Sequence, residues 1–382
     1  MTDDSETAVG SVDPAALLDR LEAGDPVTLL DIRDRTEVEA WRIDHPSAVN
    51  VHVPYARFLS AKVTDSVEDL LDFERRGRLV VVCPRGQASR EVAGILREAG
   101  VEADNLAGGM EAWGRLYRRR EVGDGVYQYQ RPATGCLAYL VVDGGEALVV
   151  DPLRAFTDRY RADAADLGAD LVYAVDTHLH ADHLSGVRDL AAAGAEATLP
   201  EGTVERGFAG GVETLADGDE LAVGERTVRA VALPGHTTDM TGFALDGLLL
   251  SGDSLFLDAV ARIDLQEAGA DTETLARELY RTLHERLGAF DDGTLVCPGH
   301  FGGFEEADEA GRFVATLGAL RERVAAFDRP EADFVARLTG EQPPQPANFE
   351  RIVAINLGES DTDSEEAADL ELGPNNCAAA AD

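Results

Sequence analysis

The stretch THLHADHLSG, residues 177–186, places three histidines and an aspartate within six positions. It follows the apolar run LVYAV, which predicts a buried strand. A loop at the carboxyl end of such a strand can present His178 and His180 on the same side. Asp182 and His183 then enter where the following helix begins. Such a stretch can be a charged surface loop or a metal site, and the rest of the sequence decides between the two.

Three later segments repeat this arrangement, each with a nitrogen or oxygen donor at a glycine-containing turn after an apolar strand. LPGHTTD contains His236, LLLSGDSLF contains Asp253 and LVCPGH contains His300. Five of the eight histidines of the chain therefore lie at strand ends. Since a transition metal needs several donors that converge on one point, the sequence predicts a metal centre. The remaining histidines are not expected to be ligands: His45, His52 and His284.

The segment VVVCPRGQASREVAG places Cys83 directly after a buried strand and before a helix. Backbone N–H groups at a helix N-terminus favour negative charge, and Arg85 and Arg90 add positive potential. Both effects favour the thiolate, which is the nucleophilic form of cysteine. Because Cys83 stands past the end of the strand, we expect a reactive thiol rather than an inert buried one.

The N-terminal third alternates strands and helices. Residues 1–10 are polar and expected to be disordered, and the segments 27–34 and 78–84 read as buried strands. Residues 88–100 have apolar positions at helical spacing and end on a glycine, which is a helix stop signal. Strands that alternate with helices predict a parallel sheet covered by helices on both faces, here in a domain of residues 11–120.

A second domain is expected over residues 121–358. The charge run at 118–121 reads as a linker before it, and residues 136–152 read as two strands joined by a hairpin turn at Asp143-Gly144-Gly145. The last stretch, 359–382, is acidic and nearly free of aromatic residues, so a disordered, solvated tail is expected.

The composition limits the class of protein. A chain of 382 residues exceeds what one core usually supports, so two domains are the default. The net charge is −38 and Lys62 is the single lysine, which predicts a carboxylate-coated, halophilic surface. Nucleic acid and anionic membranes are poor partners because phosphate binding needs basic patches. The start lacks signal-peptide features, no apolar run can span a bilayer, and four cysteines without paired spacing favour the cytoplasm.

The region from about Val126 to Gly358 resembles the metallo-β-lactamase superfamily in the order of its donor motifs, which are H-x-H-x-D-H, P-G-H-T, G-D and P-G-H. The resemblance implies an αββα sandwich with the metal at one edge. Within the superfamily the region looks most like persulfide dioxygenases (sulfur dioxygenases) and glyoxalase II. Three segments favour the resemblance to the persulfide dioxygenases: GDSLF, Arg262-Ile263-Asp264-Leu265 and PPQPANFERIVAINLG.

The resemblance to persulfide dioxygenases implies one Fe(II) per chain, held by His178, His236 and Asp253. Two histidines and one carboxylate leave an open face on iron, which O2 and a substrate sulfur can share.

The resemblance to glyoxalase II implies one or two Zn(II) ions instead. It adds four donors at superfamily ligand positions: His180, Asp182, His183 and His300. In the glyoxalase II arrangement, His180 joins His178 and His236 on the first ion. The second ion is held by Asp182, His183 and His300, and Asp253 bridges the two ions. Such a pair activates a water for hydrolysis, and the donors alone do not choose between the two enzymes.

Arg262 and Asp264 match a segment in which the relatives carry glycines where this chain has Ala259 and Ala261. They are interpreted as a pair that braces the metal site, with an ordinary surface ion pair as the alternative. After His300 the relatives often carry an acidic residue and a tyrosine; this chain has Phe-Gly, which leaves the thiol substrate open.

The loop C-x-x-G-x-x-S at Cys83 resembles the active loop of rhodanese domains, with further similarity in LLDIRDRTEVEAWRIDHPSAVNVHVP and NLAGGMEAWGRLYR. The resemblance implies that Cys83 is the persulfide-carrying nucleophile, and that Arg85, Gly86 and Ser89 belong to the loop that cradles its sulfane sulfur. Ala88 stands where many relatives carry arginine, so the sulfur donor stays open.

Together the two resemblances imply a bifunctional enzyme of sulfur metabolism, which oxidises a low-molecular-weight thiol persulfide to sulfite and transfers sulfur through Cys83. Its small-molecule partners would be the persulfide and sulfite or thiosulfate, and it could form a homo-oligomer. The alternatives are a zinc-dependent hydroxyacyl-thiol hydrolase and a non-catalytic sulfane-sulfur carrier or sensor. The other cysteines are expected to have no role: Cys136 and Cys297 as buried strand residues, and Cys377 in the tail.

We expect stability and activity to rise together from dilute buffer to molar KCl or NaCl. With a net charge of −38, like charges repel one another over about 30 Å at 0.01 M salt but only about 3 Å at 1 M. Thermal melts and activity assays across that range check this, and dialysis to low salt should inactivate the protein. A melting temperature that stays flat or falls toward molar salt would contradict a salt-adapted surface.

Overall fold

The computed structural model describes residues 9–208, 210–266, 271–342, 344–346, 348–363, 366–367, 370–372 and 377–379. The chain divides into two compact units. Unit 1 is Met1–Tyr117 with Arg131–Ala133, and unit 2 is Arg118–Gln130 with Thr134–Asp382. Most of the segment expected to be disordered at the N-terminus, residues 1–8, lies outside the described residues.

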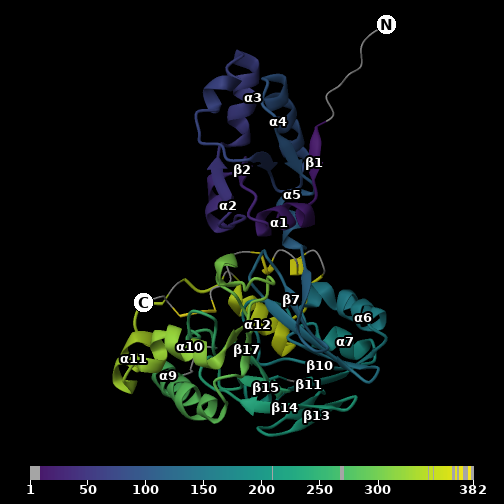
Figure 1. Cartoon of the computed structure of the whole chain (residues 1–382), viewed down its shortest axis with the longest axis vertical. Coiled ribbons are helices and arrows are strands. Elements are labelled where there is room, and N and C mark those ends of the chain that lie inside the picture. The colour runs from purple at the N-terminus through teal and green to yellow at the C-terminus, as the bar shows by residue number, and fades with distance from the viewer. Residues whose placement is uncertain are drawn as a thin grey trace. The chain divides into compact units, whose positions relative to one another are not determined.

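Unit 1 is built on a sheet of five parallel strands in the order β1-β5-β4-β2-β3, which confirms the expected parallel sheet. The strands are β1 (Gly10–Val12), β2 (Val27–Asp31), β3 (Ala48–His52), β4 (Arg78–Val82) and β5 (Asp104–Leu106). The helices between them are α1 (Pro14–Glu22), α2 (Arg35–Ala40), α3 (Tyr55–Thr64), α4 (Gln87–Glu98) and α5 (Gly109–Gly114) (Figure 1). Buried residues of β2, β4, α3 and α4 form one core, which fixes the end of β4 where the cysteine loop begins.

Unit 2 begins with a sheet of seven strands in the order β12-β11-β10-β9-β8-β7-β6. Neighbours from β12 to β9 run parallel and those from β9 to β6 run antiparallel. The strands are β6 (Arg118–Gly123), β7 (Val126–Gln130), β8 (Leu137–Asp143), β9 (Glu146–Val150), β10 (Asp170–Val175), β11 (Glu196–Pro200) and β12 (Glu213–Leu215). The hairpin predicted at Asp143-Gly144-Gly145 is the β8–β9 turn.

The charge run at 118–121 is not a linker, and the sequence-based interpretation was wrong here. Arg118, Arg119 and Arg120 lie in β6, which pairs antiparallel with β7 from Arg118 opposite Gln130. An edge strand pairs on one side only, so its charged side chains can reach solvent while the backbone continues the ladder.

The second sheet of unit 2 has six strands in the order β13-β14-β15-β16-β17-β18, all antiparallel except the β16–β17 pair. Its strands are β13 (Glu220–Val223), β14 (Arg226–Ala232), β15 (Thr241–Leu245), β16 (Leu248–Gly252), β17 (Leu295–Pro298) and β18 (Ala315–Thr316). Strand β13 contacts β8 and β9 of the first sheet, so the two sheets stack.

Helices cover this sandwich and give the expected αββα architecture (Figure 1). Helices α6 and α7 pack on β10 and β11 of the first sheet, and α10 contacts β18 of the second. The helices of unit 2 are α6 (Thr157–Asp166), α7 (Val187–Ala192), α8 (Gly202–Glu205), α9 (Thr272–Arg281), α10 (Leu317–Arg323), α11 (Glu331–Leu338) and α12 (Phe349–Leu357). Within the described residues, no helix has the length and apolar character needed to cross a membrane.

The segment after α12 needs a correction where it is described. Cys377, expected in a solvated tail, is 2% exposed. Its carbonyl accepts from the N–H of Arg262 at 3.0 Å, and the N–H of Ala379 donates to the carbonyl of Val260 at 2.9 Å. The acidic composition suggested solvation, but these backbone hydrogen bonds attach residues 377–379 to the body of unit 2. Residues 364–365, 368–369, 373–376 and 380–382 lie outside the described residues.

Candidate metal centre and cysteine loop

Three of the predicted donors form one buried group. His178 follows β10, His236 follows β14 and Asp253 follows β16, and one ligand atom from each lies within 4.8 Å of the others. Nε2 of His178 and Nε2 of His236 both lie 3.9 Å from Oδ2 of Asp253. Each side chain is 1% exposed. Three apolar strands thus deliver two imidazoles and one carboxylate to a single point.

Two of the atoms that face this point have no other partner in the part of the chain that the structure describes. Among the described residues, Nε2 of His178 and Oδ2 of Asp253 are buried and have no hydrogen-bond partner. A buried polar atom left unpaired costs about 1–3 kcal/mol, so the arrangement is unfavourable unless a cation occupies the centre. The donor set therefore fits a divalent transition metal.

The ring of His178 is oriented by a relay from Asp151. The hydroxyl of Thr177 donates to Oδ2 of Asp151 at 3.0 Å, and its oxygen lies 2.9 Å from Nδ1 of His178. Because the hydroxyl proton is used on Asp151, the oxygen accepts from Nδ1–H, which leaves Nε2 with the free lone pair that a metal requires.

Asp151 itself was not identified from the sequence. It follows β9 with φ of 52°, in the left-handed region that is strained for residues other than glycine. Its Oδ1 accepts from the N–H of Thr177 at 2.6 Å and lies 3.1 Å from Nε2 of His180. Three contacts from one buried carboxylate explain why the strained conformation is retained.

A second carboxylate, Asp239, holds the backbone between the first two histidines. Its Oδ2 accepts from the N–H of Leu179 at 2.8 Å, and its Oδ1 accepts from Arg206 at 2.7 Å. Burial alone would raise the pKa of Asp239, but the guanidinium of Arg206 and several hydrogen bonds hold it below its ordinary value. The sequence carried no local signal for this residue, because its partners are distant along the chain.

Arg262 and Asp264 form a partly buried pair rather than an ordinary surface pair. The side chain of Arg262 is fully buried and donates to Asp264 at 2.7 and 2.8 Å. The carbonyl of Arg262 accepts from Nδ1–H of His236 at 2.7 Å. The contact with the metal group is therefore made by the main chain of Arg262, which the ion pair holds in place.

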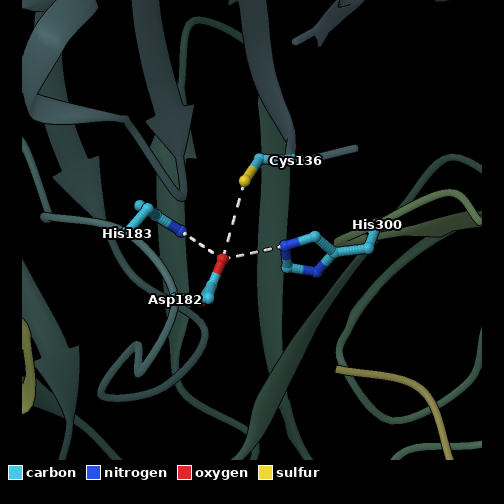
Figure 2. Close-up of side chains that lie close together, drawn as sticks. All are labelled: Cys136, Asp182, His183 and His300. Carbon is cyan, nitrogen blue, oxygen red and sulfur yellow. Dashed lines mark hydrogen bonds and ion pairs between the residues drawn. The ribbon is translucent and has the colours of Figure 1, made fainter. Parts of the chain in front are cut away.

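Three of the four other predicted donors form a second group together with a residue that the sequence did not single out. Figure 2 shows an oxygen of Asp182 facing His183, His300 and the sulfur of Cys136. This oxygen, Oδ2, lies 3.0 Å from Nδ1 of His183, 2.9 Å from Nε2 of His300 and 3.5 Å from the sulfur. Cys136 is buried as expected, but it lies just before β8 with its sulfur in this cluster. His180 belongs to neither group, since its Nε2 faces Asp151 and Asp176.

The two groups meet at Asp253. Its Oδ1 lies 2.7 Å from Nδ1 of His300, while its Oδ2 faces the first group. Burial alone would raise the pKa of Asp253, but the charge and hydrogen bond of His300 keep it lowered. Burial, then the neighbouring imidazoles, lowers the pKa of His178, so this ring is neutral and able to bind a metal. Burial would raise the pKa of Cys136, yet the charge of His300 leaves it lowered to about 7.

Cys83 lies between β4 and α4 as the sequence predicts, but it is buried, at 2% exposure, and packs against the core of unit 1. The sulfur accepts from the N–H of Gly86 at 3.1 Å and from the N–H of Ser89 at 3.3 Å, at the start of α4. Gly86 has φ of 83°, a conformation that glycine adopts readily. The hydroxyl of Ser89 lies 3.0 Å from the sulfur and donates to Asn105, which the sequence did not single out. Arg85 is exposed and paired with Glu111, so its charge is partly neutralised.

Two family models match the chain. The model of the rhodanese-like domain matches residues 13–116, and that of the metallo-beta-lactamase superfamily matches residues 131–300.

Curated relatives match the second region. The mitochondrial persulfide dioxygenase ETHE1 of Homo sapiens is 28% identical over 238 residues, which cover 60% of this chain and 86% of that protein. A hydroxyacylglutathione hydrolase of Methylococcus capsulatus is 31% identical over 206 residues, which cover 52% of this chain and 70% of that protein.

Solved structures agree on the fold. A metallo-beta-lactamase from Staphylococcus aureus subsp. aureus COL aligns with a TM-score of 0.55 at 25% identity, over 61% of this chain and 74% of that chain. ETHE1 from Myxococcus xanthus aligns with a TM-score of 0.53 at 24% identity, over 64% of this chain and 100% of that chain, a likeness that shows the fold alone.

Substitution Asp151→Ala should weaken the metal centre. It leaves the buried N–H of Thr177 without its acceptor, which is expected to lower the free energy of unfolding by about 1–3 kcal/mol. Loss of the group that orients the histidines should lower metal affinity by about 10–100-fold. Denaturant unfolding and metal retention against a chelator measure the two effects.

Asp246→Ala is the matched control, since Asp246 also has positive φ, 45°, but lies exposed in the β15–β16 turn. Equal destabilisation of both variants with unchanged metal retention would contradict the orienting role of Asp151.

Proposed function

We propose, for a chain that belongs to the metallo-beta-lactamase superfamily and carries a rhodanese-like domain before it, that unit 2 oxidises a thiol persulfide at one iron and that Cys83 carries sulfane sulfur. The observation that carries this proposal is the buried group of His178, His236 and Asp253. Two histidines and one carboxylate are the ligand set of non-haem Fe(II) oxygenases, which keeps open positions for O2 and substrate.

The proposed reaction converts R–S–SH, O2 and water into R–SH, sulfite and two protons. The outer sulfur is oxidised, O2 is reduced, and the S–S bond breaks with the thiol as leaving group. Bound iron would supply the redox chemistry that couples O2 to sulfur. The protein positions the donors: Thr177 keeps the proton of His178 on Nδ1, and the carbonyl of Arg262 does the same for His236. Burial of the group excludes bulk water.

Hydrolysis of a thioester at two zinc ions is the alternative, since hydroxyacylglutathione hydrolases are among the relatives. That reaction needs both ions to activate a water, with Asp253 bridging them. Here Oδ1 of Asp253 lies 2.7 Å from Nδ1 of His300. This hydrogen bond leaves Oδ2 of Asp253 facing His178 and His236, which are the donors of the proposed iron site.

In unit 1, the sulfur of Cys83 would attack the outer sulfur of thiosulfate. The S–S bond of thiosulfate breaks, sulfite leaves, and Cys83 becomes a persulfide. The N–H groups of Gly86 and Ser89 converge on the cysteine sulfur and favour negative charge in the loop. Transfer onward to a small thiol, or back to sulfite, releases the sulfur. A protein that served only as a carrier or sensor would show this loading without consuming O2.

Metal analysis of the purified protein should find about one iron per chain, because nitrogen and oxygen donors without thiolate form the first group. Removal of iron with a chelator should abolish O2 uptake on a supplied small-molecule persulfide, and Fe(II) should restore it. An iron-free protein that holds two zinc ions and hydrolyses thioesters at full rate would contradict the dioxygenase proposal.

Cys83→Ser should abolish sulfur transfer from thiosulfate and leave persulfide-dependent O2 uptake within about twofold of the parent, because the two sites share no residues. Cys297→Ser, in the buried strand β17, is the control that should affect neither. Loss of O2 uptake in Cys83→Ser, with a small persulfide supplied directly, would show that the two sites do not act separately.

A further inference from the structure

We propose that Thr282 is a positioning residue of the first donor group, the group of His178, His236 and Asp253. Its hydroxyl donates to the carbonyl of Pro234 at 2.7 Å and so sets where His236, two residues further on, meets the metal. The inference rests on the proposed metal in this group but not on the reaction that the metal performs. Thr282 lies 48 positions beyond Pro234 in the chain, and the motif around His236 does not single it out.

The loop that carries His236 lies directly against the helix that precedes Thr282. Gly235 has φ of 144°, and a Cβ at this position would lie 2.4 Å from the Cβ of Leu279 in α9. Because no side chain fits there, the backbone of the loop touches the helix. Beyond Leu279 along the same helix, the hydroxyl of Thr282 holds Pro234. A close contact and a hydrogen bond, about one helical turn apart, therefore fix the loop at two points.

The helix is shaped so that Thr282 stays on its buried face. Four leucines recur at every fourth position and are at most 2% exposed: Leu275, Leu279, Leu283 and Leu287. In a regular α-helix, side chains four positions apart diverge by about 40° per step, so this row would turn toward solvent. The N–H of Leu287 donates to the carbonyl of Thr282, an i→i+5 bond that forms a wider π-helical turn. The wider turn keeps the leucines and the neighbouring Thr282 against the body of unit 2.

Thr282 anchors the residues before His236, whereas another segment holds the histidine ring and the residues after it. Nδ1–H of His236 donates to the carbonyl of Arg262 at 2.7 Å, and the N–H of Thr238 donates to Oε1 of Gln266 at 2.8 Å. A metal site needs its donors within about 0.5 Å of the productive geometry. Release of Pro234 from Thr282 would therefore let the backbone of His236 shift away from the metal.

The test follows the loss of metal from the full-length protein to a chelator, with the metal that the protein carries when purified. Thr282 is fully buried, and Thr282→Val keeps the shape of its side chain while it removes the donor to Pro234. Metal loss from this variant should be at least about tenfold faster than from the parent. Thr282→Ser keeps the hydroxyl and removes the methyl group, so it should lose metal at nearly the rate of the parent.

Thr28→Val is the matched control. Thr28 is also fully buried, and its hydroxyl donates to the carbonyl of Arg76 at 3.0 Å, but it lies in β2 of unit 1. The same substitution there should lower the midpoint of denaturant unfolding without changing the rate of metal loss. The comparison separates the effect of a lost buried hydrogen bond from an effect on the metal site.

Three outcomes would overturn the proposal: metal loss from Thr282→Val at the rate of the parent, equally fast loss from Thr28→Val, or equally fast loss from Thr282→Ser. Should Thr282→Val fail to fold, Thr282→Ala removes the same hydroxyl and is compared with Thr282→Ser in the same way. The measured quantity is metal loss and not O2 uptake. A protein that holds zinc and hydrolyses thioesters would therefore contradict the dioxygenase proposal and still decide the role of Thr282.

Discussion

Asp253 is the residue on which both donor groups of unit 2 depend, because its two oxygens face different neighbours. Oδ2 lies 3.9 Å from His178 and from His236, and Oδ1 lies 2.7 Å from His300. A carboxylate with 1% exposure needs a positive or donating group at each oxygen. His300 supplies one at Oδ1, and a bound metal would supply the other at Oδ2. Any change that rotates this carboxylate therefore disturbs both groups together.

The glycines of the donor motifs follow from this constraint. A Cβ on Gly299 would lie 2.4 Å from Oδ1 of Asp253, and Gly252 has φ of 50° with Thr177 only 2.8 Å from where its Cβ would stand. The G-D and P-G-H pairs therefore allow the backbone to approach the carboxylate closely. The same turns end β16 and β17, whose parallel pairing sets Asp253 beside His300.

Local pattern predicted much of this molecule, and its limits are physical. Strand ends, the hairpin and the donors at glycine turns all depend on neighbours in sequence, so periodicity and spacing located them. Cys136 and Asp239 depend on contacts with distant segments, and nothing beside them in the chain distinguishes them from ordinary core residues. The charge run in β6 was misjudged for a related reason, because the pairing of an edge strand is decided by its partner strand and not by its own polarity.

The cysteines show that environment, rather than residue type, sets the chemistry of each thiol. Cys83 accepts hydrogen bonds from backbone N–H groups at the start of α4, a position that favours negative charge in the loop. Cys297 lies in β17, where burial raises its pKa to about 12 and keeps it protonated and inert. Cys136 is equally buried, yet the charge of His300 opposes desolvation and lowers its pKa to about 7. Since burial is common to Cys136 and Cys297, the difference comes from the imidazoles of His300 and His183, which oppose the effect of burial on the pKa of Cys136, while the carboxylate of Asp182 adds to it.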